Sequence, residues 1–174
     1  DLLEKVEFIV DAVSDYKSVF LLFPEFFNAP LMSKYNDKGE SQAIRGLAQY
    51  TEEIRDRFIN LAISYNINII TGSMPLIKED GLLYNAGFLC RRDGTYEMYE
   101  KLHVTPDEIK SWGLSGGKQL KTFETDCAKI GILICYDVEF PELSRLMADQ
   151  GMQILFVPVL TDSQNAYSRV RVCA

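Results

Sequence analysis

Short continuous apolar runs are the feature that most restricts the fold of this chain of 174 residues. Residues 19–23 are all apolar and end at Pro24, and comparable runs occupy residues 130–134 and 154–157. The first run has no alternating polar residue, which is typical of a strand buried on both faces in a sheet that helices cover on either side. The sequence therefore predicts a partly parallel sheet in an α/β protein.

Amphipathic helices alternate with these strands. Residues 2–13 and 41–66 carry apolar side chains at helical spacing, with charged side chains between them. An Asp93-Gly94 pair between two strand-like segments predicts a β-hairpin. Residues 103–117, with a proline and a Gly-Gly pair, favour a loop with at most a short helix. The remaining expected elements are strands at 67–74, 83–91, 96–101, 122–125, 129–135 and 153–160, and helices at 140–150 and from Tyr167 onward. This alternation predicts a layered α/β fold with helices on both sheet faces.

The charge balance excludes several classes of partner. Eighteen Lys and Arg against 25 Asp and Glu give a net charge of −7, so no broad basic surface is available for nucleic acid or an anionic membrane. The apolar runs are far shorter than the ~20 residues that span a bilayer. No basic segment followed by an apolar one opens the chain, so we expect a signal peptide to be absent or already removed.

The cysteines indicate a compartment and argue against a metal site. Cys90, Cys127, Cys135 and Cys173 are widely spaced without a Cys-x-x-Cys pair, and the chain has a single histidine, so no metal site is expected. Free thiols in a reducing cytoplasm are the default interpretation, and one disulfide is the alternative. We interpret the cysteines other than Cys135 as packing residues.

Cys135 ends the strand expected at 129–135, and a helix is expected to begin near Pro141. A thiol at the carboxyl end of a strand lies where open α/β sheets place their sites. Amides just past that strand could form an oxyanion hole for acyl transfer. The alternative is a cysteine that merely packs in the core, and this position alone favours the two equally.

Two charged residues also stand at strand ends. Glu25 follows Pro24 and precedes two phenylalanines, an environment in which a carboxylate tends to have a raised pKa and can accept a proton near neutrality. Lys101 closes the strand at 96–101, and a desolvated ammonium beside a thiol would favour the thiolate and stabilise an oxyanion. Taken alone, each is more simply a turn residue or a solvated charge. A dyad of Cys135 with His103 as base is another solution, although a lone histidine near a strand end is more often structural.

Three motifs in order resemble the nitrilase, or carbon-nitrogen hydrolase, superfamily. They are Phe23-Pro24-Glu25, Glu100-Lys101-Leu102-His103 and Gly131-Ile-Leu-Ile-Cys135-Tyr136-Asp137 with Phe140-Pro141-Glu142. Each motif alone is weak, but their order, with Arg145 and a late strand at 154–158 following, makes the resemblance specific over essentially the whole chain. It implies that residues 1–174 are a carbon-nitrogen hydrolase domain with a four-layer αββα sandwich.

The same resemblance implies roles for individual residues. Glu25 would be the general base, Lys101 the cationic stabiliser and Cys135 the nucleophile that forms a thioester. Glu108 stands where many members have a second glutamate, and the backbone amide of Tyr136 would join Lys101 in the oxyanion hole. Cys135-Tyr-Asp is similar to the amidase and carbamoylase branches, which implies hydrolysis of a small-molecule amide without a metal or organic cofactor.

The resemblance leaves open alternative functions, the residues of the substrate pocket, the oligomeric state and the neighbouring domains. An acyltransferase with the same triad, or an inactive scaffold or interaction module of the same fold, is an alternative function. Trp112, Tyr136 and Phe27 are candidates for an acyl pocket, with core packing as the alternative.

Family members commonly form dimers or higher oligomers, so a homo-oligomer is expected. The family's domain is longer at both ends, which predicts a partial, truncated domain. Residues 161–174 are similar to a bacterial subgroup that carries an upstream N-acetyltransferase-like domain.

Overall fold

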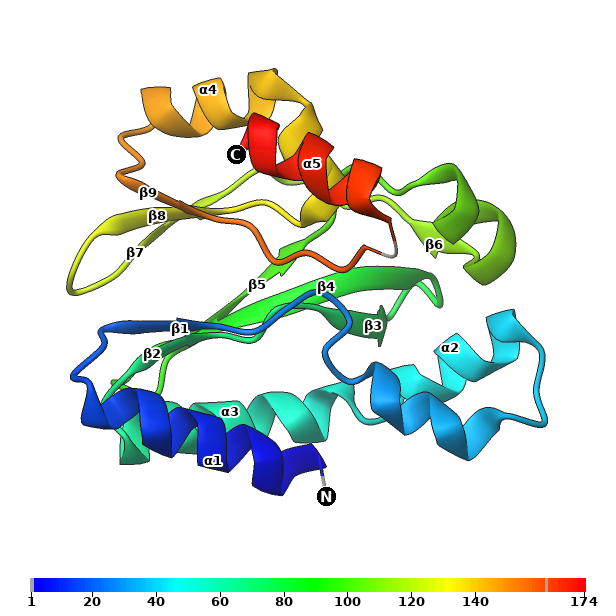
Figure 1. Ribbon diagram of the computed structural model, residues 1–174, viewed down its shortest axis with the longest axis horizontal. Coiled ribbons are helices and arrows are strands. Elements are labelled where there is room, and N and C mark those ends of the chain that lie inside the picture. Colours follow the sequence, from blue (N-terminus) through cyan, green and yellow to red (C-terminus); the bar gives the residue numbers. More distant parts are fainter. Residues whose placement is uncertain (1, 162) are drawn as a thin grey trace.

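The computed structural model describes residues 2–161 and 163–174, and its two β-sheets stack face to face between two layers of helices (Figure 1). One sheet contains β1 Phe20–Leu22, β2 Asn68–Ile70, β3 Met74–Ile77, β4 Leu83–Cys90, β5 Tyr96–Glu100 and β6 Leu114–Ser115. The other contains β7 Thr122–Glu124, β8 Lys129–Ile132 and β9 Ile154–Phe156. The helices are α1 Leu2–Asp15, α2 Glu40–Ala48, α3 Thr51–Ser64, α4 Pro141–Asp149 and α5 Gln164–Cys173, with short helices η1 Ala29–Tyr35, η2 Glu108–Trp112 and η3 Cys135–Glu139.

Three layers of apolar contacts hold the four layers of secondary structure together. The strand β4 shows this best, because its side chains alternate between two faces. Phe88 and Cys90 pack in the cluster under α1 and α3, whereas Leu89 packs between the two sheets with Phe123 and Ile130. A third cluster joins the smaller sheet to α4 and α5, which cover its outer face (Figure 1). The expected αββα sandwich is therefore confirmed.

The sheets combine parallel and antiparallel pairs. β1 pairs with β2, and β8 with β9, in parallel, in agreement with the prediction of a partly parallel sheet. β4 and β5 form the expected hairpin, and Gly94 in its turn has a φ of +87°. β1 differs from the expected strand buried on both faces, because its residues are only half-buried and Val19 is 45% exposed. Its position explains the difference, since β1 lies at the edge of the sheet and pairs only with β2.

The helix expected at 41–66 is two helices, α2 and α3. The apolar stripe serves two different clusters: Ile44 and Leu47 pack with Phe26, whereas Ile54 and Phe58 pack under α1. One straight helix could not reach both clusters, and the helix is interrupted between Ala48 and Thr51. The start of α3 is fixed to β3, because the Thr51 hydroxyl donates a 2.6 Å hydrogen bond to the Pro75 carbonyl.

The strand expected at 67–74 is likewise two strands, β2 and β3. Gly72 between them has a φ of +66°, and a Cβ there would lie 1.9 Å from the Pro24 carbonyl oxygen. The backbone of Pro24 thus crosses Gly72 at a distance that only glycine permits. The Phe26 N–H donates to the Ser73 hydroxyl, 3.3 Å away, so this break supports the turn that carries Glu25.

Smaller differences concern the C-terminal third and the cysteines. The strand expected at 153–160 is only β9, and α5 begins before Tyr167, where the Ser163 hydroxyl accepts the N–H of Ala166 at 3.2 Å. All four cysteines are free thiols. Cys90 is buried as expected, but Cys127 and Cys173 are exposed, so their interpretation as packing residues is wrong. No helix among the described residues has the length and apolar character to cross a membrane.

Candidate functional site

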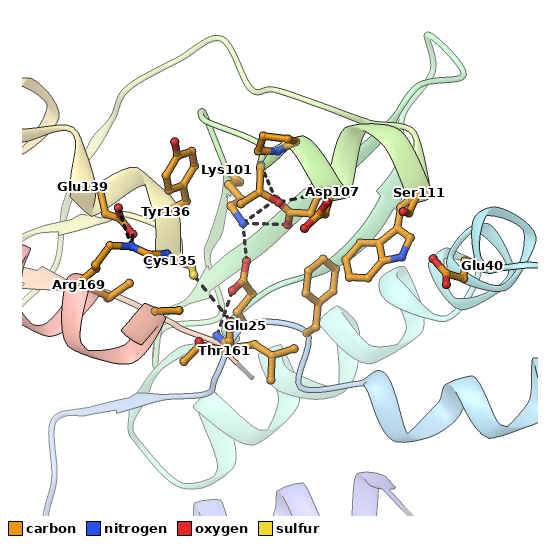
Figure 2. Close-up of a pocket in the computed structure, with 18 residues that line it drawn as sticks. Glu25, Glu40, Lys101, Asp107, Ser111, Cys135, Tyr136, Glu139, Thr161 and Arg169 are labelled. Carbon is orange, nitrogen blue, oxygen red and sulfur yellow. Dashed lines mark hydrogen bonds and ion pairs between the residues drawn. The ribbon is translucent and has the colours of Figure 1, made fainter. Parts of the chain in front are cut away.

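The candidate residues come from four separate segments and meet in one cavity of about 650 Å³. Glu25 follows β1, Lys101 directly follows β5, Glu108 begins η2 and Cys135 begins η3 after β8. Figure 2 shows Lys101 facing Glu25, with the Cys135 sulfur beside them. The structure therefore brings together all four side chains that the sequence singled out.

Lys101 lies between two buried carboxylates. Its Nζ is 2.9 Å from Glu25 Oε1, 2.8 Å from Glu108 Oε1 and 2.9 Å from Glu108 Oε2. Burial alone lowers the pKa of a lysine, but here the two carboxylates outweigh it and hold the pKa of Lys101 above its ordinary value. Lys101 is therefore a fixed cation.

The two carboxylates differ in whether they keep a free hydrogen-bond acceptor position. A carboxylate offers about four acceptor positions, two on each oxygen. Glu108 uses all four, for two contacts with Lys101, the Thr105 N–H at 2.7 Å and the Asn85 amide at 3.5 Å. In Glu25, Oε1 accepts from Lys101 and from Asn85, both at 2.9 Å, whereas Oε2 accepts one backbone donor, the Leu160 N–H at 3.0 Å. Glu25 Oε2 thus keeps an acceptor position, and Glu108 has none.

Burial raises the pKa of Glu25 above its ordinary value of 4.5, although contact with Lys101 opposes this. Glu25 is only 3% exposed. A carboxylate with a raised pKa is a stronger proton acceptor, when ionised, than one in water.

Cys135 begins η3 with a φ of +48°, in the left-handed region that a residue with a side chain enters at a cost of about 1–2 kcal/mol. Its thiol lies 3.8 Å from the Leu160 carbonyl oxygen. Burial, followed by the charge of Glu25, raises the pKa of the Cys135 thiol to about 12, although Lys101 acts in the opposite direction. Lys101 thus favours the thiolate, as expected, but burial and the nearby carboxylate outweigh this single cation.

His103 has partners of its own. Its Nδ1 lies 3.2 Å from Asp137 Oδ1, and its ring stacks on Phe140 with the centroids 3.7 Å apart. His103 does not line the cavity that holds Cys135, so the geometry favours the structural interpretation over a Cys-His dyad. The His, Cys, Asp and Glu side chains of the described residues form no group of three or more suited to a metal ion.

The aromatic walls of the cavity match the expectation in part. Trp112 and Tyr136 line it, but Phe27 packs in the core against Phe23 and Phe58. Phe26 takes its place in the wall and meets Trp112 edge to face. Phe26 has a φ of +48°, which turns the chain sharply. Phe26 therefore faces the cavity, and Phe27 faces the core.

The sequence profile of the family named Carbon-nitrogen hydrolase matches residues 1–171. The chain belongs to the carbon-nitrogen hydrolase family. The resemblance based on the three motifs is thereby confirmed.

Relatives and solved structures of the carbon-nitrogen hydrolases agree with this assignment. The chain is 48% identical over 170 residues to the probable hydrolase YhcX of Bacillus subtilis (strain 168), covering 98% of this chain and 33% of that protein. It is 33% identical over 164 residues to omega-amidase NIT2 of Homo sapiens, covering 87% of this chain and 54% of that protein. The fold is similar to a carbon-nitrogen hydrolase from Helicobacter pylori G27, with a TM-score of 0.80, 22% identity, and coverage of 98% of this chain and 60% of that one. The chain thus spans a third to three fifths of these proteins.

Sequence reasoning missed two buried polar residues of this carbon-nitrogen hydrolase site. Asn85 donates to both carboxylates, and Asp137 joins the loops that carry Lys101 and Cys135. A signal for Asn85 was present, since it is a polar residue inside the apolar strand β4. Asp137 was noted only as part of the Cys135-Tyr-Asp motif.

Asp137→Asn is expected to destabilise the fold by about 2 kcal/mol, because an amide NH2 would face backbone N–H donors. Asp137 is fully buried and accepts the N–H groups of Leu102, His103 and Ile134 at 2.7 to 3.3 Å. Urea unfolding measures the effect. The control Asp149→Asn alters an exposed side chain and should stay within about 0.5 kcal/mol of wild type. Equal stability of the two variants would contradict the role of Asp137 as a tie between the loops.

Proposed function

We propose that the protein is a cysteine-dependent hydrolase of carbon-nitrogen bonds in small-molecule amides. The observation that carries this proposal is the meeting of a thiol, a carboxylate with a free acceptor position and a fixed ammonium in one cavity. The family assignment and the omega-amidase among the relatives support an amide substrate. Cys135 is the nucleophile, Glu25 the general base and acid, and Lys101 the cationic stabiliser.

In the first step, the proton of the Cys135 thiol passes to Glu25 Oε2 while the sulfur attacks the amide carbonyl carbon. Because the thiol has a pKa near 12, the proton leaves during the attack rather than before it. The carbonyl electron pair moves to oxygen and forms a tetrahedral oxyanion. When the carbon-nitrogen bond breaks, the leaving nitrogen takes the proton from Glu25, which leaves a thioester on Cys135.

In the second step, water attacks the thioester and gives a proton to Glu25. A second tetrahedral oxyanion collapses, the carbon-sulfur bond breaks, and the sulfur regains a proton from Glu25 as the carboxylic acid leaves. All atoms come from the amide, water and the three side chains.

The oxyanion needs donors in both steps. The three N–H bonds of Lys101 face carboxylates at rest, but two of them face the same Glu108. One can turn to the developing oxyanion while Glu108 keeps the other. The backbone amide of Tyr136, which follows the nucleophile and whose residue lines the cavity, is the second donor in this proposal.

Ammonia release from a panel of small primary amides tests the proposal, with intact-mass detection of an acyl group on Cys135. We expect ammonia from wild type and none above background from Cys135→Ala. Acid release without an added amine separates hydrolysis from acyl transfer, because a transferase turns over only when an acceptor such as hydroxylamine is present. The absence of both turnover and acylation across the panel would instead support the inactive scaffold.

A further inference from the structure

Asn85 occupies the centre of the site, although it lies in the middle of a sheet. It is 1% exposed and belongs to β4, in which every residue is buried. Its Cα partner on β3 is Pro75, and its own carbonyl oxygen accepts the Lys101 N–H at 2.9 Å. The backbone of Asn85 therefore fixes the point at which Lys101 leaves β5.

Both N–H groups of the Asn85 side chain donate to carboxylates. Nδ2 lies 2.9 Å from Glu25 Oε1 and 3.5 Å from Glu108 Oε1. Its Oδ1 is buried, yet it has no hydrogen-bond partner among the described residues. An orphaned buried acceptor is unfavourable, and an apolar residue would suit this strand better unless the amide has a function.

The function follows from the acceptor positions on Glu25. With Lys101 and Asn85 both on Oε1, that oxygen is saturated, and the vacant position lies on Oε2. Without the amide, Oε1 would regain a vacant position, and the carboxylate could turn or take the proton on the wrong oxygen. A neutral amide supplies this donor without adding a charge beside Lys101.

We propose that Asn85 is a positioning residue that directs the Cys135 proton to Oε2 of Glu25 by saturating Oε1. This inference rests on the proposed role of Glu25 as general base. The Cys135 S–H bond breaks as the Oε2–H bond forms, and Asn85 itself gains and loses no proton.

The test compares the pH dependence of Cys135 alkylation by iodoacetamide, and of kcat/KM, in Asn85→Ala and wild type. Loss of a donor to the ionised carboxylate should move the acidic limb of both profiles upward by about one pH unit. Asn85→Asp keeps the shape but adds a third carboxylate, so its limb should move further in the same direction. Asn85→Ser keeps one hydroxyl donor and should fall between Asn85→Ala and wild type; it also serves if Asn85→Ala does not fold.

The matched control is Asn68→Ala. Asn68 is also fully buried in the same sheet and donates to a carboxylate, that of Asp126 at 3.0 Å, but lies outside the cavity. The Asn68→Ala variant should be less stable than wild type, but the acidic limb of its pH profile should not move. An unshifted limb in folded Asn85→Ala or Asn85→Ser would overturn the inference. Glu25→Gln separates the two proposals, because an acidic limb that survives this substitution would overturn the role of Glu25 itself.

Discussion

Replacing Lys101 with methionine is expected to destabilise the fold by about 3–5 kcal/mol at neutral pH. The methionine fills a similar volume, but it leaves Glu25 and Glu108 as two unpaired carboxylates that are 3% and 6% exposed. Neither carboxylate can then remain ionised without a large desolvation cost, and the pKa of Glu25 rises further because Lys101 no longer opposes the effect of burial. Urea unfolding measures the loss of stability.

The pH dependence identifies the cause of this loss. A carboxyl whose pKa in the folded state is raised carries no penalty when both states are protonated. The penalty grows as pH rises from the pKa of the unfolded state to that of the folded state. The destabilisation in Lys101→Met should therefore shrink toward acidic pH. Lys78→Met is the control, because its 2.6 Å pair with Glu100 is partly exposed and contributes less than about 1 kcal/mol. A loss independent of pH, or equal to that in Lys78→Met, would show that Lys101 does not stabilise the two carboxylates.

The sequence predicted the parts of the site that stand at the ends of strands. Apolar runs stop where the chain leaves the core, so Glu25, Lys101 and Cys135 were visible as polar residues at these points. The layered architecture followed for a similar reason, because the period of burial is local information. Glu108 depended on the family resemblance, since a loop offers no such period.

The features of the fold and the site that the sequence did not predict depend on contacts between distant segments. The Leu160 N–H reaches Glu25 across 135 positions and Asn85 reaches it across 60, and tertiary packing rather than a local pattern decides such pairs. The break between α2 and α3 was hidden because the apolar spacing continues while its packing partners change. The high pKa of Cys135 was not foreseen, because it depends on burial and Glu25 together, which no local pattern reports.

In the proposed mechanism, Cys135 keeps its proton until substrate is present. Cys135 is a thiol at rest, Lys101 is held by two carboxylates and Glu25 has one vacant acceptor position. A free thiolate would react with any electrophile that entered, whereas this arrangement ties deprotonation to attack on a bound carbonyl.

The largest effect on catalysis is expected when the proton acceptor or the nucleophile is removed. Cys135→Ala should lower kcat/KM for an amide at least about 10,000-fold, because no thioester can form. Glu25→Gln keeps the size of the side chain but removes the base, and a fall of about 100- to 10,000-fold is expected. Steady-state ammonia release measures both. Glu139→Gln is the control, because Glu139 lines the same cavity but pairs with Arg169 at its rim, and its effect should stay below about tenfold.

The pH profile distinguishes a base from a residue that merely shapes the cavity. The reaction needs Glu25 ionised, so the rate should fall as pH decreases through a pKa that burial raises above 4.5. No alkaline loss is expected below pH 10.5, because the pKa of Lys101 is held above that value. Removing the base should abolish the acidic limb together with most of the rate, whereas a packing defect would lower the rate evenly across the profile. An even loss in Glu25→Gln would therefore contradict the proposed transfer of the thiol proton to Glu25.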